Sequence, residues 1–203
     1  MLFAKIKQHY EAVVAVCCFL ILFTNVGLPS TSFSVYQPYL VDLPGVGHSG
    51  GSIIVSVRTF VSLLAMLVVG RYYDLVDCRI GTFLATLSVS AGFALYSLAG
   101  SNFGMLCGAS ALTGLGYGFG GMIASTMLIN RWFRANMATV AGVAAVGSGV
   151  AAIVIPNAAV ALISAFDLQT AFRAESALAL VIGVTVFALL RNDPRDMGLT
   201  PYE

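Results

Sequence analysis

The chain has 203 residues, of which 59% are hydrophobic and 9% are charged, and its mean hydropathy is +0.92. Soluble domains are roughly 45–50% apolar and about 25% charged, so this composition excludes a soluble enzyme or a soluble binding domain. A net charge of +1 also excludes a nucleic-acid-binding protein, which needs basic residues gathered on one face. The composition predicts an integral membrane protein that is surrounded by the lipid bilayer.

Long apolar runs, bounded by charged or turn-forming residues, follow one another along the chain, and each can cross a bilayer as a helix of about 20 residues. They cover residues 12–40, 51–69, 80–99, 103–129, 137–163 and 174–190. The runs do not alternate apolar and polar residues, which excludes a membrane β-barrel. The sequence therefore predicts an all-α membrane protein. Its transmembrane domain, a six-helix bundle over residues 12–190, lies between tails at 1–11 and 191–203.

Three of the runs have irregular features. The first is interrupted near Gly27 and Pro29. It is also longer than the 7–15 residues of a signal-peptide core, so we expect it to be retained as the first span and not cleaved as a signal peptide. The fourth carries glycines spaced four apart within 114–121, which let a neighbouring backbone approach closely. These glycines do not form a phosphate-binding loop, because such a loop needs a preceding strand and surrounding water. The fifth contains Pro156.

Basic residues predict the orientation. Eight of the ten lie before the first run, after the last, or in the connections that six crossings place on the same side: Lys5, Lys7, Arg71, Arg79, Arg131, Arg134, Arg191 and Arg195. The opposite connections at 42–50, 100–102 and 164–170 contain none. Because Lys and Arg are enriched in cytoplasmic loops, we expect both termini to be cytoplasmic and the protein to be multi-pass in the plasma (inner) membrane.

The connection between the second and third runs, residues 70–81, resembles the signature loop of the major facilitator superfamily. Gly70, Asp74 and Arg79 occupy matching positions. The chain departs from the pattern at Leu75, Asp77 and Cys78. Further segments resemble the oxalate/formate antiporter and monocarboxylate transporter branch. They are residues 130–134, the glycines and Pro156 of the fifth run, residues 171–173 and the tail at 193–202.

This resemblance implies a transporter of a small solute, an organic anion such as a carboxylate, that works by alternating access without a cofactor. Members of the superfamily have two six-helix halves, and this chain is similar to the first, with a tail at 191–203 that resembles the start of the central loop. A second half would then come from a separate chain, a missing segment or a second copy of this chain. The alternative is a half that acts as a membrane scaffold or partner subunit without transport.

Arg58 lies inside the second run, near the expected midplane of the bilayer. A charge at that depth costs at least about 2.5–3.5 kcal/mol, so the side chain needs an acceptor, and no Asp or Glu occurs at matching depth in another run. The acceptor is an anionic substrate, a group in the second half, or backbone carbonyls and water. A lipid-facing side chain that reaches the interface is the remaining interpretation.

In the family, the first and fourth spans line the substrate cavity. By this resemblance the candidate substrate-binding residues besides Arg58 are Asn25, Tyr36, Gln37 and Tyr117, with Asn157 in the fifth run as a weaker addition. Each of these side chains is equally consistent with a hydrogen bond between neighbouring helices.

The resemblance also implies a gating motif in the signature loop, formed by Gly70, Asp74 and Arg79; a solvated loop is the alternative. Arg173 and Glu175 are expected at the mouth of the sixth run, in a structural role.

An intramembrane enzyme is the main rival class. Ser110 lies within a run, but His9 and His48 lie outside the runs, so a serine protease in the membrane would lack its base. Asp74 and Asp77 are too few ligands for a dedicated metal site, and no His-Glu-x-x-His motif occurs. The sequence predicts neither an enzyme nor a metal site.

Overall fold

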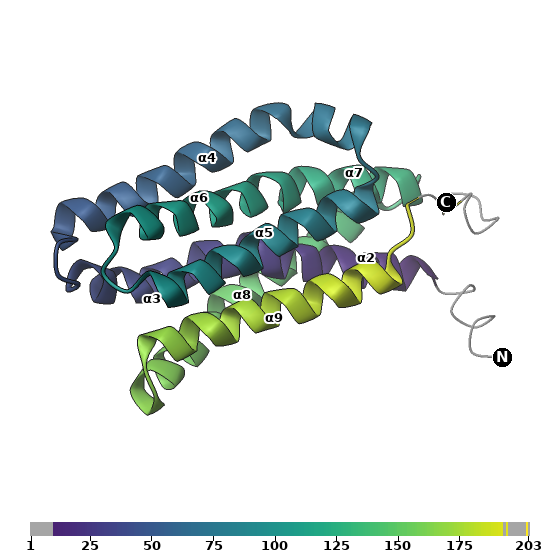
Figure 1. Cartoon of the computed structure of the whole chain (residues 1–203). Helices are drawn as coiled ribbons and strands as arrows, with labels where there is room; N and C mark the ends of the chain where they lie inside the picture. Colours follow the sequence, from purple (N-terminus) through teal and green to yellow (C-terminus); the bar gives the residue numbers. More distant parts are fainter. Residues whose placement is uncertain (1–9, 193, 195–201, 203) are drawn as a thin grey trace.

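The structure is a computed structural model that describes residues 10–192, 194 and 202 (Figure 1). These residues form helices, and the only β-type pairing among them is an isolated bridge between Phe133 and Tyr202. In chain order the helices are α2 (Tyr10–Leu22), the π-helix η1 (Phe23–Gly27), α3 (Leu28–Val41), α4 (Gly47–Leu75), α5 (Cys78–Ala99), α6 (Phe103–Gly120), α7 (Met122–Trp132), α8 (Met137–Ala165) and α9 (Leu168–Leu189).

Six of the resulting segments are long and apolar enough to cross a membrane, which confirms the predicted number of spans. The first joins α2, η1 and α3 into one span at Tyr10–Val41, and the fourth joins α6 and α7 at Phe103–Trp132. The other spans are single helices. The chain is therefore an all-α, multi-pass integral membrane protein.

The two ends of this bundle meet on the same side. The Tyr10 hydroxyl, at the start of α2, donates a hydrogen bond of 2.7 Å to the carbonyl of Leu189, at the end of α9. An even number of crossings is required for this contact. We refer to this side, where α2 begins and α9 ends, as the terminal end, and to the other side as the opposite end (Figure 1).

The sixth span begins earlier than the hydropathy of the sequence predicts. Asp167 is its N-cap and accepts a hydrogen bond of 2.7 Å from the backbone N–H of Thr170, so α9 starts at Leu168 and not at residue 174. Arg173 and Glu175 consequently lie inside the helix, and the prediction that they sit at its mouth is wrong. Arg173 is exposed, whereas Glu175 is buried.

The predicted interruption of the first span is confirmed as a π-helical turn. The N–H of Leu28 bonds the carbonyl of Phe23, five residues back, which widens the helix at η1. Pro29, which follows directly, has no N–H to donate to the preceding turn. Such π-turns are rare and often mark functional segments, and here the turn separates α2 from α3.

Glycines of α6 set how closely its neighbours pack, as the spacing within 114–121 predicts. A Cβ atom on Gly114 or Gly118 would lie within 2.8 Å of a backbone carbonyl oxygen of α4, and one on Gly116 would lie 2.6 Å from the carbonyl oxygen of Ala85 on α5. Alternate glycines therefore let α6 approach α4 on one face and α5 on another. The helix breaks at Gly121, where α7 begins.

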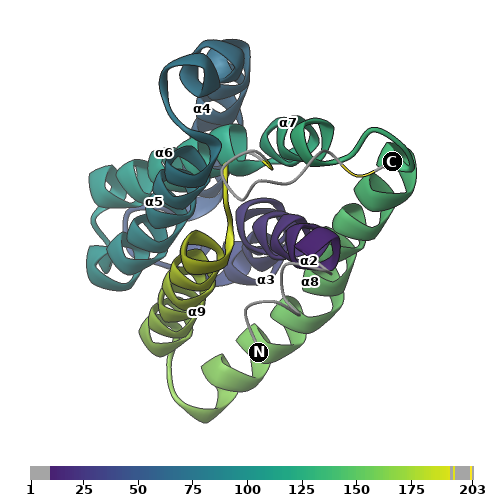
Figure 2. The same ribbon diagram turned by 90° about the vertical axis from the view of Figure 1, so that its right-hand side faces the viewer.

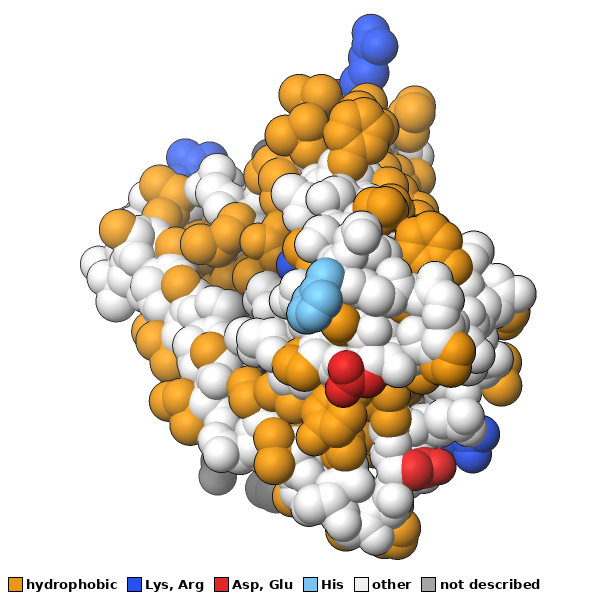
Figure 3. All heavy atoms as spheres, turned by 90° about the vertical axis from the view of Figure 1, so that its left-hand side faces the viewer, with side chains coloured by type: hydrophobic (Ala, Val, Ile, Leu, Met, Phe, Trp, Pro, Cys, Tyr) orange, Lys and Arg blue, Asp and Glu red, His pale blue; other side chains and the backbone are white. Residues whose placement is uncertain are grey.

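α4 stands at the margin of the bundle, where it packs mainly against α6 (Figure 2). Large apolar side chains on its outer side are exposed, among them Phe60, Leu63, Leu67 and Leu75. Seen from the opposite end, most of the coloured side chains are hydrophobic, and charged ones are few (Figure 3). The exposed apolar side of α4 suits lipid or another membrane helix rather than water.

Gly116→Ala tests the close packing of α5 on α6. The new methyl group would meet the Ala85 carbonyl, so the helices must separate, and overpacking of this kind costs about 1–3 kcal/mol. We expect a lower melting temperature of the purified protein in detergent, followed by circular dichroism. Gly142→Ala in α8 is the matched control, because nothing lies within 4 Å of its Cβ position. Equal melting temperatures for the two variants would contradict this packing.

Candidate functional site

Arg58 lies well inside the membrane-spanning part of α4. It follows Gly47 by 11 residues, which places it about 17 Å along the helix axis from the opposite end. Its side chain is half-buried. At this depth a lipid-exposed guanidinium would be costly, so its charge has to be stabilised by groups within the protein.

Neutral groups hold the Arg58 side chain. Its Nη1 donates a hydrogen bond to the backbone carbonyl of Pro29, at the start of α3. Its guanidinium carbon lies 5.2 Å from the centre of the Phe33 ring, a cation–π contact. The ionisable groups near it are the phenols of Tyr96 and Tyr117, and no carboxylate contacts it within the described part of the chain. The positive charge therefore lacks a counter-charge from these residues.

The backbone around Arg58 is fixed by its contacts with α6. Gly114 faces Arg58 so closely that a Cβ atom there would lie 2.6 Å from the Arg58 carbonyl oxygen. One turn earlier, the buried Ser110 hydroxyl donates to the carbonyl of Ile54 at 2.6 Å and accepts from the Tyr96 hydroxyl at 2.9 Å. These contacts determine the position from which the guanidinium extends.

Arg58 lines a cavity of about 150 Å³. It is lined by side chains of α3, α4 and α6, namely Ser30, Arg58, Thr59, Ser62 and Tyr117. Ligand pockets for drug-sized molecules are about 300–1,000 Å³, so this one fits a solute of a few heavy atoms. Ser30, Thr59 and Ser62 each donate to a carbonyl of their own span, and rotation of these hydroxyls would turn the same donors toward a bound oxygen.

A polar stripe on α3 leads from this cavity to the opposite end. Ser30, Ser34 and Gln37 are spaced by four and three residues, so they share one face of the helix. Ser34 and Gln37 line a second cavity, of about 320 Å³, together with Asp42 from the connection to α4 and His48 from the first turn of α4. The stripe gives this side of α3 a polar surface from the end of the helix to Arg58.

Two predicted site residues point elsewhere. Asn25, in η1, is fully buried, and its Nδ2 donates to the Thr86 hydroxyl of α5 at 3.0 Å and to the Ile21 carbonyl at 3.2 Å. Tyr36 is also buried, and its hydroxyl donates to Glu175 Oε1 on α9 at 2.7 Å. Both side chains connect the first span to neighbouring helices and do not line the Arg58 cavity.

The remaining predicted residues divide between cavity and surface. Tyr117 lines the cavity with Arg58, and Gln37 lies on the polar stripe. Asn157 is exposed on α8 and donates to the Ile153 carbonyl of its own helix at 2.6 Å. The structure thus brings Arg58 and Tyr117 together and leaves Asn157 apart.

Sequence reasoning missed Ser30, Thr59 and Ser62 as cavity residues, and it missed the burial of Glu175. Ser62 lies four residues after Arg58, so helical periodicity alone places both on one face and could have identified it. Glu175 was missed because the sixth helix was expected to begin too late.

Residues of the signature loop lie at the terminal end. Gly70 and Asp74 are exposed in the last turns of α4. Arg79, at the start of α5, donates from Nε to the Phe187 carbonyl at 2.7 Å and lies 4.2 Å from the centre of that residue's ring. Arg79 thus contacts α9, where it satisfies a carbonyl near the helix C-terminus.

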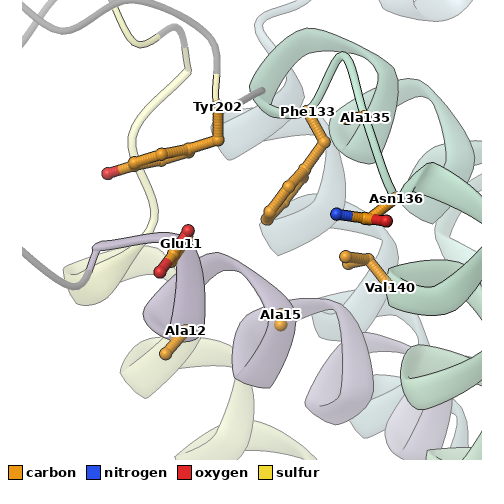
Figure 4. Close-up of a pocket in the computed structure, with 8 residues that line it drawn as sticks. All are labelled: Glu11, Ala12, Ala15, Phe133, Ala135, Asn136, Val140 and Tyr202. Atoms are coloured by element: carbon orange, nitrogen blue, oxygen red, sulfur yellow. The ribbon is translucent and has the colours of Figure 1, made fainter.

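Another pocket, of about 260 Å³, lies at the terminal end between the start of α2 and the connection from α7 to α8 (Figure 4). Its lining is mostly apolar apart from Glu11 and Asn136. Tyr202 closes one side, and its backbone N–H donates to the Trp132 carbonyl at 2.9 Å. Partial burial raises the pKa of the Tyr202 phenol. These contacts hold residue 202 against α7 and contribute no charge to the Arg58 cavity.

Chemical groups for catalysis or metal binding are sparse in the described residues. Nowhere in these residues do three or more His, Cys, Asp or Glu side chains gather into a group that could hold a metal ion. The four cysteines are free thiols. The chemistry that the Arg58 cavity offers is a positive charge and neutral hydrogen-bond donors.

Comparison with known proteins supports the resemblance noted in the sequence. A sequence model of the Major Facilitator Superfamily matches residues 14–202, which include nearly all of the first span and the whole of the other five. A search of curated proteins found no match. The match is to the superfamily as a whole.

Thiol labelling tests the geometry of the cavity. With the native cysteines replaced by alanine, we expect Ser30→Cys in membranes to react with a water-soluble thiol reagent, because Ser30 is exposed and lines the cavity. Thr24→Cys, on the same span, is the matched control and should stay unlabelled, because Thr24 is fully buried. Labelling of Thr24→Cys at the same rate as Ser30→Cys would contradict the burial of Thr24 and the access of water to Ser30.

Proposed function

Because the chain belongs to the major facilitator superfamily, whose members are membrane transporters of small solutes, we propose that it transports a small organic anion, a carboxylate. It acts as one half of a secondary transporter that works by alternating access. The observation that carries this proposal is the Arg58 guanidinium, which lies in a polar cavity inside the membrane without a carboxylate contact among the described residues.

The donors of Arg58 suit a carboxylate. A guanidinium has five N–H donors in a planar fork, and the contact to Pro29 uses Nη1, so other donors remain for an anion. Arginine pairs with carboxylates through two parallel hydrogen bonds, which adds geometric selectivity to charge attraction. The hydroxyls of Thr59 and Ser62 would bind a further oxygen of the same solute. The small cavity favours an anion of few atoms.

The first span supplies a device for alternating access. α3 carries the polar stripe and the carbonyl that accepts from Arg58, and it is joined to α2 through the π-turn at η1. An anion that draws Arg58 away from Pro29 would release this end of α3 to move. At the terminal end, Gly70, Asp74 and Arg79 would act as the gate, with the Arg79 contact to α9 broken and remade between states.

Orientation follows from the positive-inside rule. Arg71 and Arg79 flank the connection between α4 and α5 at the terminal end, and Arg131 and Arg134 flank the end of α7. The connections at the opposite end contain no Lys or Arg. We therefore place the terminal end in the cytoplasm and the protein in the plasma (inner) membrane.

A second six-helix half would complete the substrate site. The exposed apolar face of α4 suits burial against other membrane helices, and Thr59, on that helix, is exposed beside the cavity. The second half is supplied by a separate chain, a further segment or a second copy of this chain. Parallel repeats of this kind are related by an axis along the membrane normal, so two copies inserted in the same direction satisfy the geometry.

Arg58→Gln tests the anion site. Loss of a charged donor costs about 1.5–3 kcal/mol, so we expect carboxylate affinity to fall by roughly ten- to a hundredfold. The measurement is the rise in melting temperature produced by a panel of small carboxylates, each compared with its neutral amide, together with uptake into vesicles. Arg173→Gln is the matched control, because Arg173 is exposed on α9. A carboxylate response that survives Arg58→Gln but not Arg173→Gln would remove Arg58 from the pathway.

Assembly gives a second test. A single copy presents one side of the cavity, so we expect uncrosslinked monomers of this chain to show no carboxylate flux in liposomes. Flux should appear only with a paired half, detected by crosslinking at positions on α4. Vigorous flux by monomers would contradict the need for a second half. Pairing without flux or carboxylate binding would favour the scaffold alternative.

A further inference from the structure

Glu175 is an acidic side chain buried inside the bundle, with 5% of its surface exposed. It lies seven residues into α9, about 10 Å along the helix from the opposite end. Its Oε1 accepts the hydrogen bond from Tyr36 on α3, and Oε2 has no hydrogen-bond partner among the described residues. Ionisable groups at such depth are costly, and those retained there generally take part in function.

A second unpartnered atom lies beside this carboxyl group. Ser32 precedes Tyr36 by four residues, so both hydroxyls lie on one face of α3. The Ser32 side chain faces Glu175, and its buried Oγ has no hydrogen-bond partner among the described residues. An ionised carboxylate can only accept hydrogen bonds, whereas a protonated one also donates from its O–H. Gain or loss of a proton therefore changes which groups donate and which accept between α3 and α9.

Such a change would act on α3 rather than on α9. Next to Glu175, Ser176 and Ser90 of α5 bond each other's carbonyls reciprocally at 2.8 and 2.9 Å, which fixes α9 to α5. α3 instead follows the π-turn and Pro29, where the helix can bend. The same short helix meets Arg58 through the Pro29 carbonyl and the Phe33 ring. α3 thus joins the buried acid to the anion cavity.

We propose that Glu175 is a proton-binding site within the membrane, and that α3 couples its protonation to anion binding at Arg58. The proton site stands on the burial and unpartnered atoms of Glu175 and Ser32. Its coupling to transport rests on the proposed function. A proton would then be the ion that accompanies the carboxylate.

A cavity lies between Glu175 and the opposite end, with Phe172 in its lining. This cavity, of about 240 Å³, lies between α3, α5 and α9, and Asp167 also lines it. Phe172 lies three residues before Glu175, and its ring centre is 4.4 Å from that of Tyr36 and 5.2 Å from that of Tyr96. Glu175 itself does not line this cavity, so water would have to reach it past Phe172. On release, the O–H bond of the carboxyl group breaks, such a water accepts the proton, and the electron pair stays on Glu175. Uptake reverses these steps.

Few other charges face this route. On α3 the titratable group beside Glu175 is Tyr36, and on α5 it is Tyr96, behind Phe172. Helix α8, which also packs against α9, carries no titratable side chain. On α9 itself Arg173 is exposed, and Asp167 lies at its start, where hydrogen bonds from Thr170 hold the pKa of Asp167 below its usual range. A carboxylate at the mouth of the cavity would attract protons to it.

Infrared spectroscopy tests the proton site without any transport assay. Carboxyl-labelled ¹³C-glutamate marks the side chains of Glu11, Glu175 and Glu203. In lipid vesicles of the full chain, without added anion, we expect a labelled carboxylic-acid band that appears and disappears reversibly with pH. All three labelled side chains can bind a proton, so Glu175 is assigned the part of this band that is lost in Glu175→Gln. That part should be retained in Glu11→Gln, the matched control, because Glu11 is exposed. A Glu175 band that never changes while the protein stays folded would overturn the proposal.

Tyr36→Phe provides a second variant that leaves the acid in place. Removing this donor should move the midpoint of the Glu175 titration by about one pH unit. Tyr39→Phe should leave it unchanged, because Tyr39 is exposed on the same helix. Equal midpoints in the wild type and Tyr36→Phe would refute the pairing of Glu175 with α3.

Added carboxylate, compared with its amide, then tests the coupling. We expect it to change the Glu175 band in the wild type and not in Arg58→Gln. If the wild type binds carboxylate but its Glu175 band is unaffected, the coupling is wrong. If Glu175 titrates in a protein that binds no carboxylate, the proton site stands and the proposed function fails.

Discussion

A guanidinium inside the membrane without a carboxylate contact is the constraint on which the rest of this structure depends. Arg58 is held by a carbonyl and an aromatic ring, which lower its cost in the bilayer but leave its charge uncompensated by the described residues. Water, an anion or a further protein segment must complete the site. The polar cavity and the stripe on α3 are arranged around this requirement.

Close helix packing makes the site possible. Gly114 brings α6 against the Arg58 backbone, and Ser110 bonds the same helix one turn earlier. Because one contact is a close backbone approach and the other a buried hydrogen bond, α4 and α6 form a rigid pair from which the arginine extends. The first span differs, since η1 separates α3 from α2 and α3 contacts Arg58 and Glu175 through different residues. Binding of a ligand at Arg58 would therefore move α3 relative to the rigid pair of α4 and α6.

Much of the fold follows from the sequence because hydrophobic length and charge placement are strong signals in membranes. The spans, the interruption at Gly27 and Pro29, and the close approach at the fourth-span glycines were all predictable. The start of the sixth helix was not, because hydropathy reports the apolar run, whereas the Asp167 cap determines where the helix begins. That error concealed the depth of Glu175.

The site was predictable only in part. Arg58 stands out in any hydropathy reading, and Ser62 follows from it by helical spacing. The orientation of the Asn25 and Tyr36 side chains depends on which helices pack against the first span. The residues around them in the sequence do not specify those helix–helix contacts. Ser32 and Glu175 are 143 residues apart in the sequence, and only the packed bundle brings their side chains together.

The central claim is that Arg58 binds the carboxylate directly, and a distance measurement tests it. Solid-state nuclear magnetic resonance would record dipolar coupling between a ¹³C-labelled small carboxylate and ¹⁵N-labelled arginine side chains in lipid vesicles. The account predicts coupling in the wild type and its loss in Arg58→Lys, which keeps the charge but removes the guanidinium nitrogens. Coupling that persists in Arg58→Lys, or a bound carboxylate without coupling in the wild type, would contradict it.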